Sequence, residues 1–253
     1  MVNIYKKIYE IQQKGLAASI CTIIESSGST PRKAGAKMIV FDDKSIYGSV
    51  GGGSLEQAVI KQAHKCLIQN SPGVFEYKFD NNEGTNCGGH TKVFIEVIEP
   101  KKRLFIFGAG HIGSFLAQIA SKLNFSVTLI DDRANIFDNM TYDSIKCVNT
   151  DFTEALKSLS FDKNTFVCSA TYKHAIDKTI VEHCAKLNLA YLGMVGSKSK
   201  IATIKKDILS NNIVTEDEFN KINTPIGIGI VCKTPEEIAI SILAKLIDVS
   251  ASE

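Results

Sequence analysis

A glycine-rich turn followed by a carboxylate is the clearest chemical signal in this 253-residue sequence. Residues 108–113 read GAGHIG, which is the G-x-G-x-x-G spacing, and they lie between an apolar run, LFIF, and a helix-like segment. In such a setting Gly108 allows a tight turn, Gly110 lets the backbone approach a phosphate, and Gly113 lets the helix pack on the strand. The N–H groups at the start of the helix would then bind an anion.

The next apolar run, VTLI, ends at Asp131, which lies 18 residues beyond Gly113. A carboxylate in this place accepts hydrogen bonds from a ribose, whereas the nearby Arg133 could instead face a second phosphate. The pattern predicts a dinucleotide site. The alternative is a Rossmann-like domain that keeps its glycines for packing and binds no dinucleotide. His111 occupies a variable position of the turn, so its ring either reaches a ligand or lies in solvent at the helix start.

Two further segments follow strand-like runs, where a parallel sheet collects ligand groups. After FVCSA come His174 and Asp177, whose three-residue spacing places both on one face of a helix. Asp177 could instead only support the start of that helix. After AYLGMVG, the segment with Gly196, Ser197 and Lys198 offers N–H groups, a hydroxyl and an ammonium group to an anion.

A second set of candidate residues lies in the first half of the chain. A triple glycine precedes a helix for which Ser54 is the expected N-cap, with Gln57 three residues on. Two basic residues lie beside a turn at Pro31, and one cysteine is flanked by glycines that leave its thiol approachable. That thiol is either a soft ligand or a small buried residue at a strand start. The set comprises Arg32, Lys37, Gly51, Gly52, Gly53, Ser54, Glu56, Cys87, Gly88 and Gly89.

The length of 253 residues favours two modest domains or one large one to position these residues. The basic, proline-containing stretch around residues 98–103 predicts a linker between residues 1–99 and residues 103–253. From Leu104 onward, apolar runs alternate with helix-length segments, which is typical of a doubly wound parallel sheet. The first half has strand-like runs SICTIIES, GAKMIVF, SIYGSV and TKVFIEVI around one helix, which indicates a mixed α/β domain. A last helix is expected at Pro235, with a capping box of Thr234 and Glu237.

Composition excludes several classes of function. Lys+Arg 29 against Asp+Glu 27 leaves a net charge of +2, so neither nucleic acid nor an anionic membrane is an expected partner. Seven cysteines without a C-x-x-C pair favour reduced thiols. The sequence shows no secretory signal and no window of about 18 apolar residues, so a cytoplasmic protein is expected.

Six motifs together make a family resemblance. They are GSTPRKAGAKMIV, GSVGGGSLE, CGGHTKVFIE, FGAGHIG followed by DDR, YLGMVGSKSK, and PIGIGIVCKTPEEIA. In this order, over nearly the whole chain, they resemble the XdhC/CoxI family. Two departures stand out. Ser54 replaces a cysteine that is common in the CoxI-like branch, and the region of Gly229 to Cys232 lacks the aspartate of the family's closing motif.

The resemblance implies an accessory factor for xanthine dehydrogenase and related molybdenum hydroxylases. Such a protein binds molybdenum cofactor (molybdopterin), assists or protects its sulfurated form, and delivers it to the apo-hydroxylase as a chaperone. In this reading the Cys87 thiol would contact molybdenum or sulfur. A cysteine desulfurase and a second copy of the chain are further candidate partners. No catalytic triad is visible, which favours a role without independent catalysis. Two alternatives stay open: an NAD(P)-dependent oxidoreductase or redox relay, and a scaffold that binds neither ligand.

Overall fold

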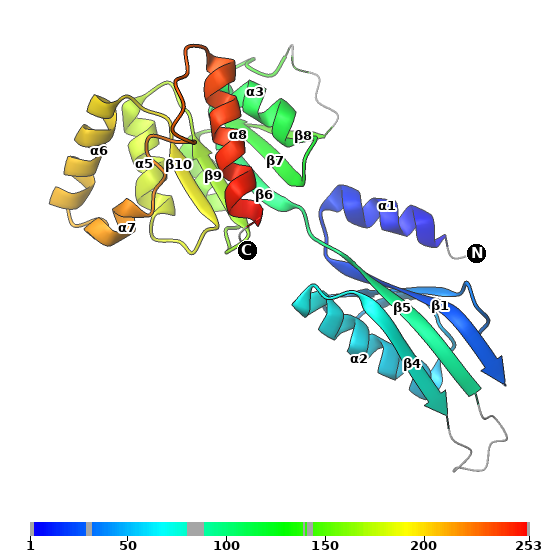
Figure 1. The fold of residues 1–253 in the computed structure, drawn as a ribbon. Helices are drawn as coiled ribbons and strands as arrows, with labels where there is room; N and C mark the ends of the chain where they lie inside the picture. Colours follow the sequence, from blue (N-terminus) through cyan, green and yellow to red (C-terminus); the bar gives the residue numbers. More distant parts are fainter. Residues whose placement is uncertain (1–2, 29–31, 80–88, 139, 141–143, 252–253) are drawn as a thin grey trace. The chain divides into compact units, whose positions relative to one another are not determined.

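The computed structural model describes residues 3–28, 32–79, 89–138, 140 and 144–251. The chain divides into two compact units, Met1–Lys101 and Lys102–Glu253 (Figure 1). Each unit has its own sheet and its own buried apolar core. Each unit is therefore a compact domain with its own core.

The first unit is a five-stranded antiparallel sheet with the strand order β3-β2-β1-β5-β4. Its elements are α1 (Ile4–Lys14), β1 (Ala18–Gly28), β2 (Lys37–Phe41), β3 (Ile46–Gly48), α2 (Gly53–Gln69), β4 (Gly73–Phe79) and β5 (Gly89–Ile98). Side chains alternate along each strand, so Met38 and Val40 pack with α2, whereas Ile39 packs with α1. The mixed α/β arrangement expected for the first half is confirmed.

The second unit is a five-stranded parallel sheet with the order β10-β9-β6-β7-β8. Its strands are β6 (Lys102–Phe107), β7 (Phe125–Asp131), β8 (Ile145–Asn149), β9 (Thr165–Ser169) and β10 (Tyr191–Met194). Its helices are α3 (His111–Ala120), α4 (Phe152–Ser158), α5 (His174–Cys184), α6 (Lys198–Ser210), α7 (Glu216–Asn220) and α8 (Pro235–Ala251). The chain winds from β6 outward in one direction to β8 and then in the other to β10. The expected doubly wound Rossmann-type sheet is confirmed.

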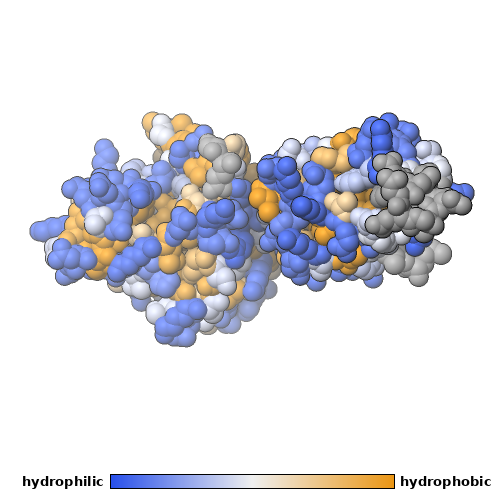
Figure 2. Space-filling view, turned by 90° about the horizontal axis from the view of Figure 1, so that it is seen from below, coloured by the Kyte–Doolittle hydropathy of each residue, from blue (hydrophilic) through white to orange (hydrophobic). Residues whose placement is uncertain are grey.

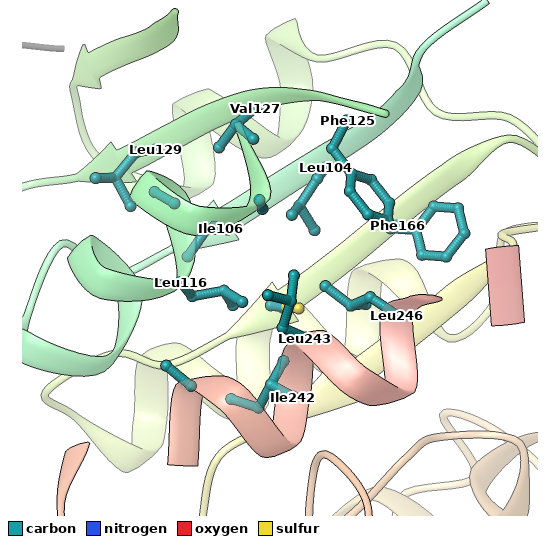
Figure 3. Packing of buried hydrophobic residues seen from close by; sticks show 14 of the residues in the cluster. Leu104, Ile106, Leu116, Phe125, Val127, Leu129, Phe166, Ile242, Leu243 and Leu246 are labelled. Carbon is teal, nitrogen blue, oxygen red and sulfur yellow. The ribbon is translucent and has the colours of Figure 1, made fainter. Parts of the chain in front are cut away.

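Helices cover both faces of this parallel sheet (Figure 1). On one face, Leu104 and Ile106 of β6 pack with Leu116 of α3 and with Ile242 and Leu246 of α8, as Figure 3 shows. On the other face a separate cluster joins the sheet to α4, α5 and α6. Burial of both faces explains why these strands are continuous apolar runs in the sequence.

The last helix begins as its capping box predicts. Thr234 Oγ1 accepts from the N–H of Glu237, and the Glu237 carboxylate accepts from the N–H of Thr234. Pro235 is the first helical residue. The helix therefore starts at a defined residue and carries the apolar face that covers β6.

Hydrophilic residues are spread over the face of each unit that Figure 2 presents, with smaller hydrophobic areas between them. Among the described helices, none is both long and apolar enough to cross a membrane.

Candidate functional site

Two of the three glycines in the 108–113 turn are required for packing. Gly108 has φ of 109°, and a Cβ there would lie 2.3 Å from the carbonyl oxygen of Ala170. A Cβ on Gly113 would lie 1.9 Å from the carbonyl oxygen of Gly108. The turn therefore contacts both the start of α3 and the loop after β9, at the point where the strand order reverses. Ligands of doubly wound sheets bind at this point.

Gly110 differs from its two neighbours. It is the N-cap of α3 in an extended conformation, and a Cβ there would meet nothing within 4 Å. The first N–H groups of a helix have no partner within the helix, and they attract anions. His111 is the first residue of α3 and its side chain is exposed. Gly110 is thus the place where a phosphate could approach the backbone.

The Asp131 side chain is hydrogen-bonded to this turn. Its carboxylate is fully buried: Oδ2 accepts from the N–H of Ala109 at 2.7 Å and from Arg133 Nη2 at 2.8 Å, and Oδ1 accepts from Arg133 Nε at 2.9 Å. The Arg133 guanidinium also lies over the Tyr172 ring, 5.2 Å from its centroid. We expected this carboxylate to meet a ribose. In the structure both oxygens are bonded within the protein, so Asp131 positions the turn and Arg133 instead.

These contacts predict an acid sensitivity. Burial by itself would raise the pKa of Asp131, but the hydrogen bonds from Arg133 and Ala109 outweigh it, so the pKa lies below its ordinary value. A depressed pKa contributes stability that is present above the unfolded-state value of about 3.9 and is lost as the pH falls through the folded-state value. Asp131→Asn should lower the free energy of unfolding at neutral pH. Plotted against pH, the free energy of unfolding of the variant should converge with that of the wild type at acid pH. Urea unfolding across this range tests the prediction, and two parallel curves would contradict it.

A buried ion pair joins the loops after β9 and β10. Asp177 Oδ2 accepts from Lys200 Nζ at 2.6 Å, and its Oδ1 accepts from Ser169 Oγ at 2.6 Å and from the N–H of Thr171 at 3.1 Å. Lys200 Nζ also donates to the carbonyl oxygen of Val195 at 2.8 Å. One carboxylate and one ammonium group thus fix two neighbouring strand ends.

His174 and Asp177 lie on the same helix, as their spacing predicts, but they differ in burial. The two do not share an environment, because Asp177 is fully buried at the inner side of α5 whereas His174 is exposed at its first residue. Lys200 was not predicted at all. A signal for it exists, because Lys200, Ile204 and Ile208 recur every fourth residue and form the buried side of α6.

The loop after β10 starts α6 with a side-chain cap. Ser197 is the N-cap, and its hydroxyl accepts from the N–H of Lys200 at 3.3 Å. Ser197 and Lys198 are exposed, and Gly196 is half-buried before them. This loop therefore presents polar groups beside the ends of β9 and β10, close to the buried pair.

In the first unit, the glycine loop is closed by a carboxylate of its own helix. Gly51, Gly52 and Gly53 have φ of 136°, 79° and 62°. Glu56 Oε2 accepts from Ser49 Oγ at 2.6 Å and from the N–H groups of Val50 and Gly52 at 3.3 Å each. A Cβ on Gly52 or Gly53 would meet nothing within 4 Å. The loop thus has an open outer side and a carboxylate bonded on its inner side.

The predicted N-cap of α2 was wrong. Gly52, not Ser54, is the N-cap, and Ser54 is exposed within the first turn. Positive φ angles at Gly52 and Gly53 bring the chain into the helix two residues earlier than expected, and Glu56 accepts a hydrogen bond from the N–H of Gly52.

The other candidates of this unit lie toward one end of the sheet. Lys37 begins β2 and donates to Thr22 Oγ1 at 2.8 Å, and Gly89 begins β5 opposite Gly28 of β1. Arg32 is exposed on the connection between β1 and β2. Antiparallel pairing places these strand ends on the same side as the glycine loop that follows β3. Cys87 and Gly88 lie outside the described residues.

Comparison with protein families decides the relationship. Residues 104–246 match the XdhC Rossmann domain, and residues 11–78 match the XdhC and CoxI family. The chain belongs to the XdhC and CoxI family. The resemblance read from the six motifs is confirmed, and the glycine turn, the Asp131 contacts and the buried ion pair all lie within the matched XdhC Rossmann domain.

Two curated relatives match this XdhC-type chain. It is 31% identical over 257 residues to the uncharacterized protein YqeB of Escherichia coli (strain K12), covering 98% of this chain and 46% of that protein. It is 32% identical over 158 residues to a probable xanthine dehydrogenase subunit of Bacillus subtilis (strain 168), covering 62% of this chain and 46% of that protein. The chain thus spans about half the length of the curated relatives it matches.

A solved structure shares the fold. A crystal structure described as a xanthine dehydrogenase from Bacillus halodurans has a TM-score of 0.55 and 22% sequence identity, and the match covers 98% of this chain and 96% of that one. At this identity the likeness supports the two-unit architecture alone. Within the described ranges, no three His, Cys, Asp or Glu side chains are grouped so that they could hold a metal ion.

Proposed function

We propose that the chain is an accessory factor for a xanthine dehydrogenase-type molybdenum hydroxylase, and that it binds molybdenum cofactor, protects its sulfurated form and inserts it into the hydroxylase. Two findings support the association: membership of the XdhC and CoxI family, and a relative whose name is that of a probable xanthine dehydrogenase subunit. In this proposal the hydroxylase is the client, a cysteine desulfurase is the sulfur donor, and a homodimer is the assembled form.

The observation that carries cofactor binding is the open backbone at Gly110. The cofactor is a pterin that bears a phosphate and a dithiolene-bound metal, so its binder needs N–H groups that face an anion. Gly110 offers that approach, and Asp131 and Arg133 hold the turn in place. When bound, the cofactor would supply the molybdenum centre, and the protein would only hold, shield and transfer it.

The first unit offers its own set of contacts for the cofactor. The open glycines Gly52 and Gly53 and the basic residues Arg32 and Lys37 suit the phosphate, and Cys87 is the candidate soft ligand. Glu56 keeps the inner side of the glycine loop bonded, so a ligand would meet the loop from its open side.

Protein purified from a host that makes the cofactor should retain close to one pterin per chain, measured by mass spectrometry and metal analysis. Arg32→Ala and Cys87→Ala should each reduce this retention. Lys33→Ala, an exposed neighbour of Arg32, and Cys147→Ala, an exposed thiol on β8, are the matched controls. Unchanged pterin retention in both test variants would overturn the contacts proposed in the first unit. No retained pterin in the wild type would overturn the proposed function.

A pyridine-nucleotide-dependent oxidoreductase or redox relay is the second candidate, because the Gly110 turn lies at the switch point of a Rossmann-type sheet. The internal bonds of Asp131 weigh against it, since they occupy the ribose acceptor. Nicotinamide fluorescence discriminates between the two, and NADH that fails to bind at millimolar concentration would remove this candidate.

A further inference from the structure

The segment after α7, the loop after β10 and helix α8 together line a cavity. The cavity has a volume of about 520 Å³ and lies beside the carboxyl end of β10. Residues 195–197 form one side, residues 225–230 and Cys232 form another, and Ile238 and Ser241 of α8 close it. The motif PIGIGIVCK, which the sequence singles out without a mechanism, is therefore the wall of a pocket.

This wall is held in place at Gly227 and Ile228. Asn223 Oδ1 accepts from the Tyr191 hydroxyl and from the N–H of Gly227, each at 2.7 Å. Ser241 Oγ donates to the carbonyl oxygen of Ile228 at 2.8 Å, and the N–H of Ile228 donates to the carbonyl oxygen of Ser241 at 3.2 Å. Gly227 has φ of 96°, and a Cβ there would lie 2.4 Å from Ser241 Oγ. The cavity is thus built by specific contacts rather than left by loose packing.

The lining has the chemistry of a pocket for a ring. Val195, Ile226, Ile228, Ile230 and Ile238 are apolar, and the hydroxyl and thiol groups among the lining side chains belong to Ser197, Ser241 and Cys232. A mostly apolar pocket of this size with few polar groups is typical of small-molecule sites. Ile228 and Ile230 are 40% and 53% exposed, which leaves apolar surface that a ring would cover.

The position links the pocket to the anion site. In strand order β10 is two places from β6, so the carboxyl ends of these strands are separated by about 10 Å. One molecule of moderate length could place a phosphate at Gly110 and a ring beside β10.

We propose that this pocket receives the planar heteroaromatic ring of a phosphate-bearing cofactor, with the Cys232 thiol at its edge. The proposal deepens the function above and rests on it. The ring could belong to the pterin of molybdenum cofactor or to a nicotinamide, and separate arms of the experiment distinguish these sources.

Alkylation of the cysteines tests the pocket. The protein is treated with iodoacetamide with and without two probes, NADH and molybdenum cofactor released from a purified hydroxylase, and mass spectrometry follows each cysteine. At a probe concentration about ten times Kd, alkylation of Cys232 should slow about tenfold, because only about a tenth of the protein is unliganded. Cys147, which is exposed on β8 and does not line the cavity, should react at an unchanged rate.

A variant with a larger side chain in the cavity gives an independent test of the pocket. Cys232→Phe should weaken binding of the effective probe at least about tenfold, whereas Cys147→Phe should not. If fluorescence shows that a probe binds but the alkylation rate of Cys232 does not change, the pocket is overturned and the proposed function still stands. If neither probe binds the wild type, the pocket and the cofactor-binding function both fail. Protection by NADH alone would assign the ring to a nicotinamide and overturn the pterin.

Discussion

Asp177→Ala is expected to destabilise the C-terminal unit by about 3–5 kcal/mol, because removing one partner of a buried ion pair leaves the other charge uncompensated. Asp177 is fully buried, and the Lys200 side chain is only 8% exposed. The substitution also removes the acceptor for Ser169 Oγ and for the N–H of Thr171. The loops after β9 and β10 would lose the ion pair that joins them. Denaturant unfolding of the full chain, followed by hydrogen exchange within residues 102–253, measures the effect.

The surface pair of Lys178 and Asp207 is the matched control. Its atoms lie 3.1 Å apart on partly exposed side chains, so Lys178→Ala should cost less than about 1 kcal/mol. The double variant Asp177→Leu with Lys200→Met should recover much of the lost stability, since apolar residues of similar size often replace buried ion pairs without loss. A change for Asp177→Ala no larger than that for Lys178→Ala would show that the buried pair does not hold these loops.

How far the sequence predicts the fold depends on burial. Strands β6, β7, β9 and β10 are apolar on both faces and were predicted from their continuous apolar runs. Two edge strands, β4 and β8, were not predicted, whereas the other two edge strands, β3 and β10, were. β8 reads IKCVN and is partly exposed along its length, so its pattern does not differ from that of a loop. The missing signal follows from exposure, because β10 is also an edge strand but is buried along its length and was predicted.

For the candidate site, local geometry was predictable and long-range partners were not. The spacing of Gly108, Gly110 and Gly113 assigns each glycine a role that depends on the turn itself. Asp131 has a local partner in Arg133, but it reaches Ala109 from another strand end, and Lys200 reaches Asp177 from another helix. No spacing rule reports such long-range pairs. Asp177 shows the limit clearly, because its partners Ser169, Thr171 and Lys200 all lie outside its own helix.

Gly113→Ala is expected to destabilise the C-terminal unit by about 3 kcal/mol or more, because overpacking against rigid backbone costs about this much. Within a helix, alanine is ordinarily more stable than glycine by about 1 kcal/mol. Here the sign reverses, since the new Cβ would lie 1.9 Å from the carbonyl oxygen of Gly108 and 3.3 Å from Ile106 Cγ2. Helix α3 would have to move away from β6, and the turn would lose its shape. Thermal unfolding should show a lower midpoint for this variant.

Gly110→Ala separates packing from binding in the same turn. Gly110 has φ of −73° and ψ of −174°, which alanine adopts without strain, and its Cβ would project into open space. Stability should therefore change by less than about 1 kcal/mol. Binding of a phosphate-bearing cofactor should weaken at least about tenfold, because the methyl group would lie where the phosphate approaches the backbone. Intact stability with unchanged cofactor affinity would exclude this turn as the anion site, and would leave the glycine loop beside Glu56 as the remaining place for the phosphate.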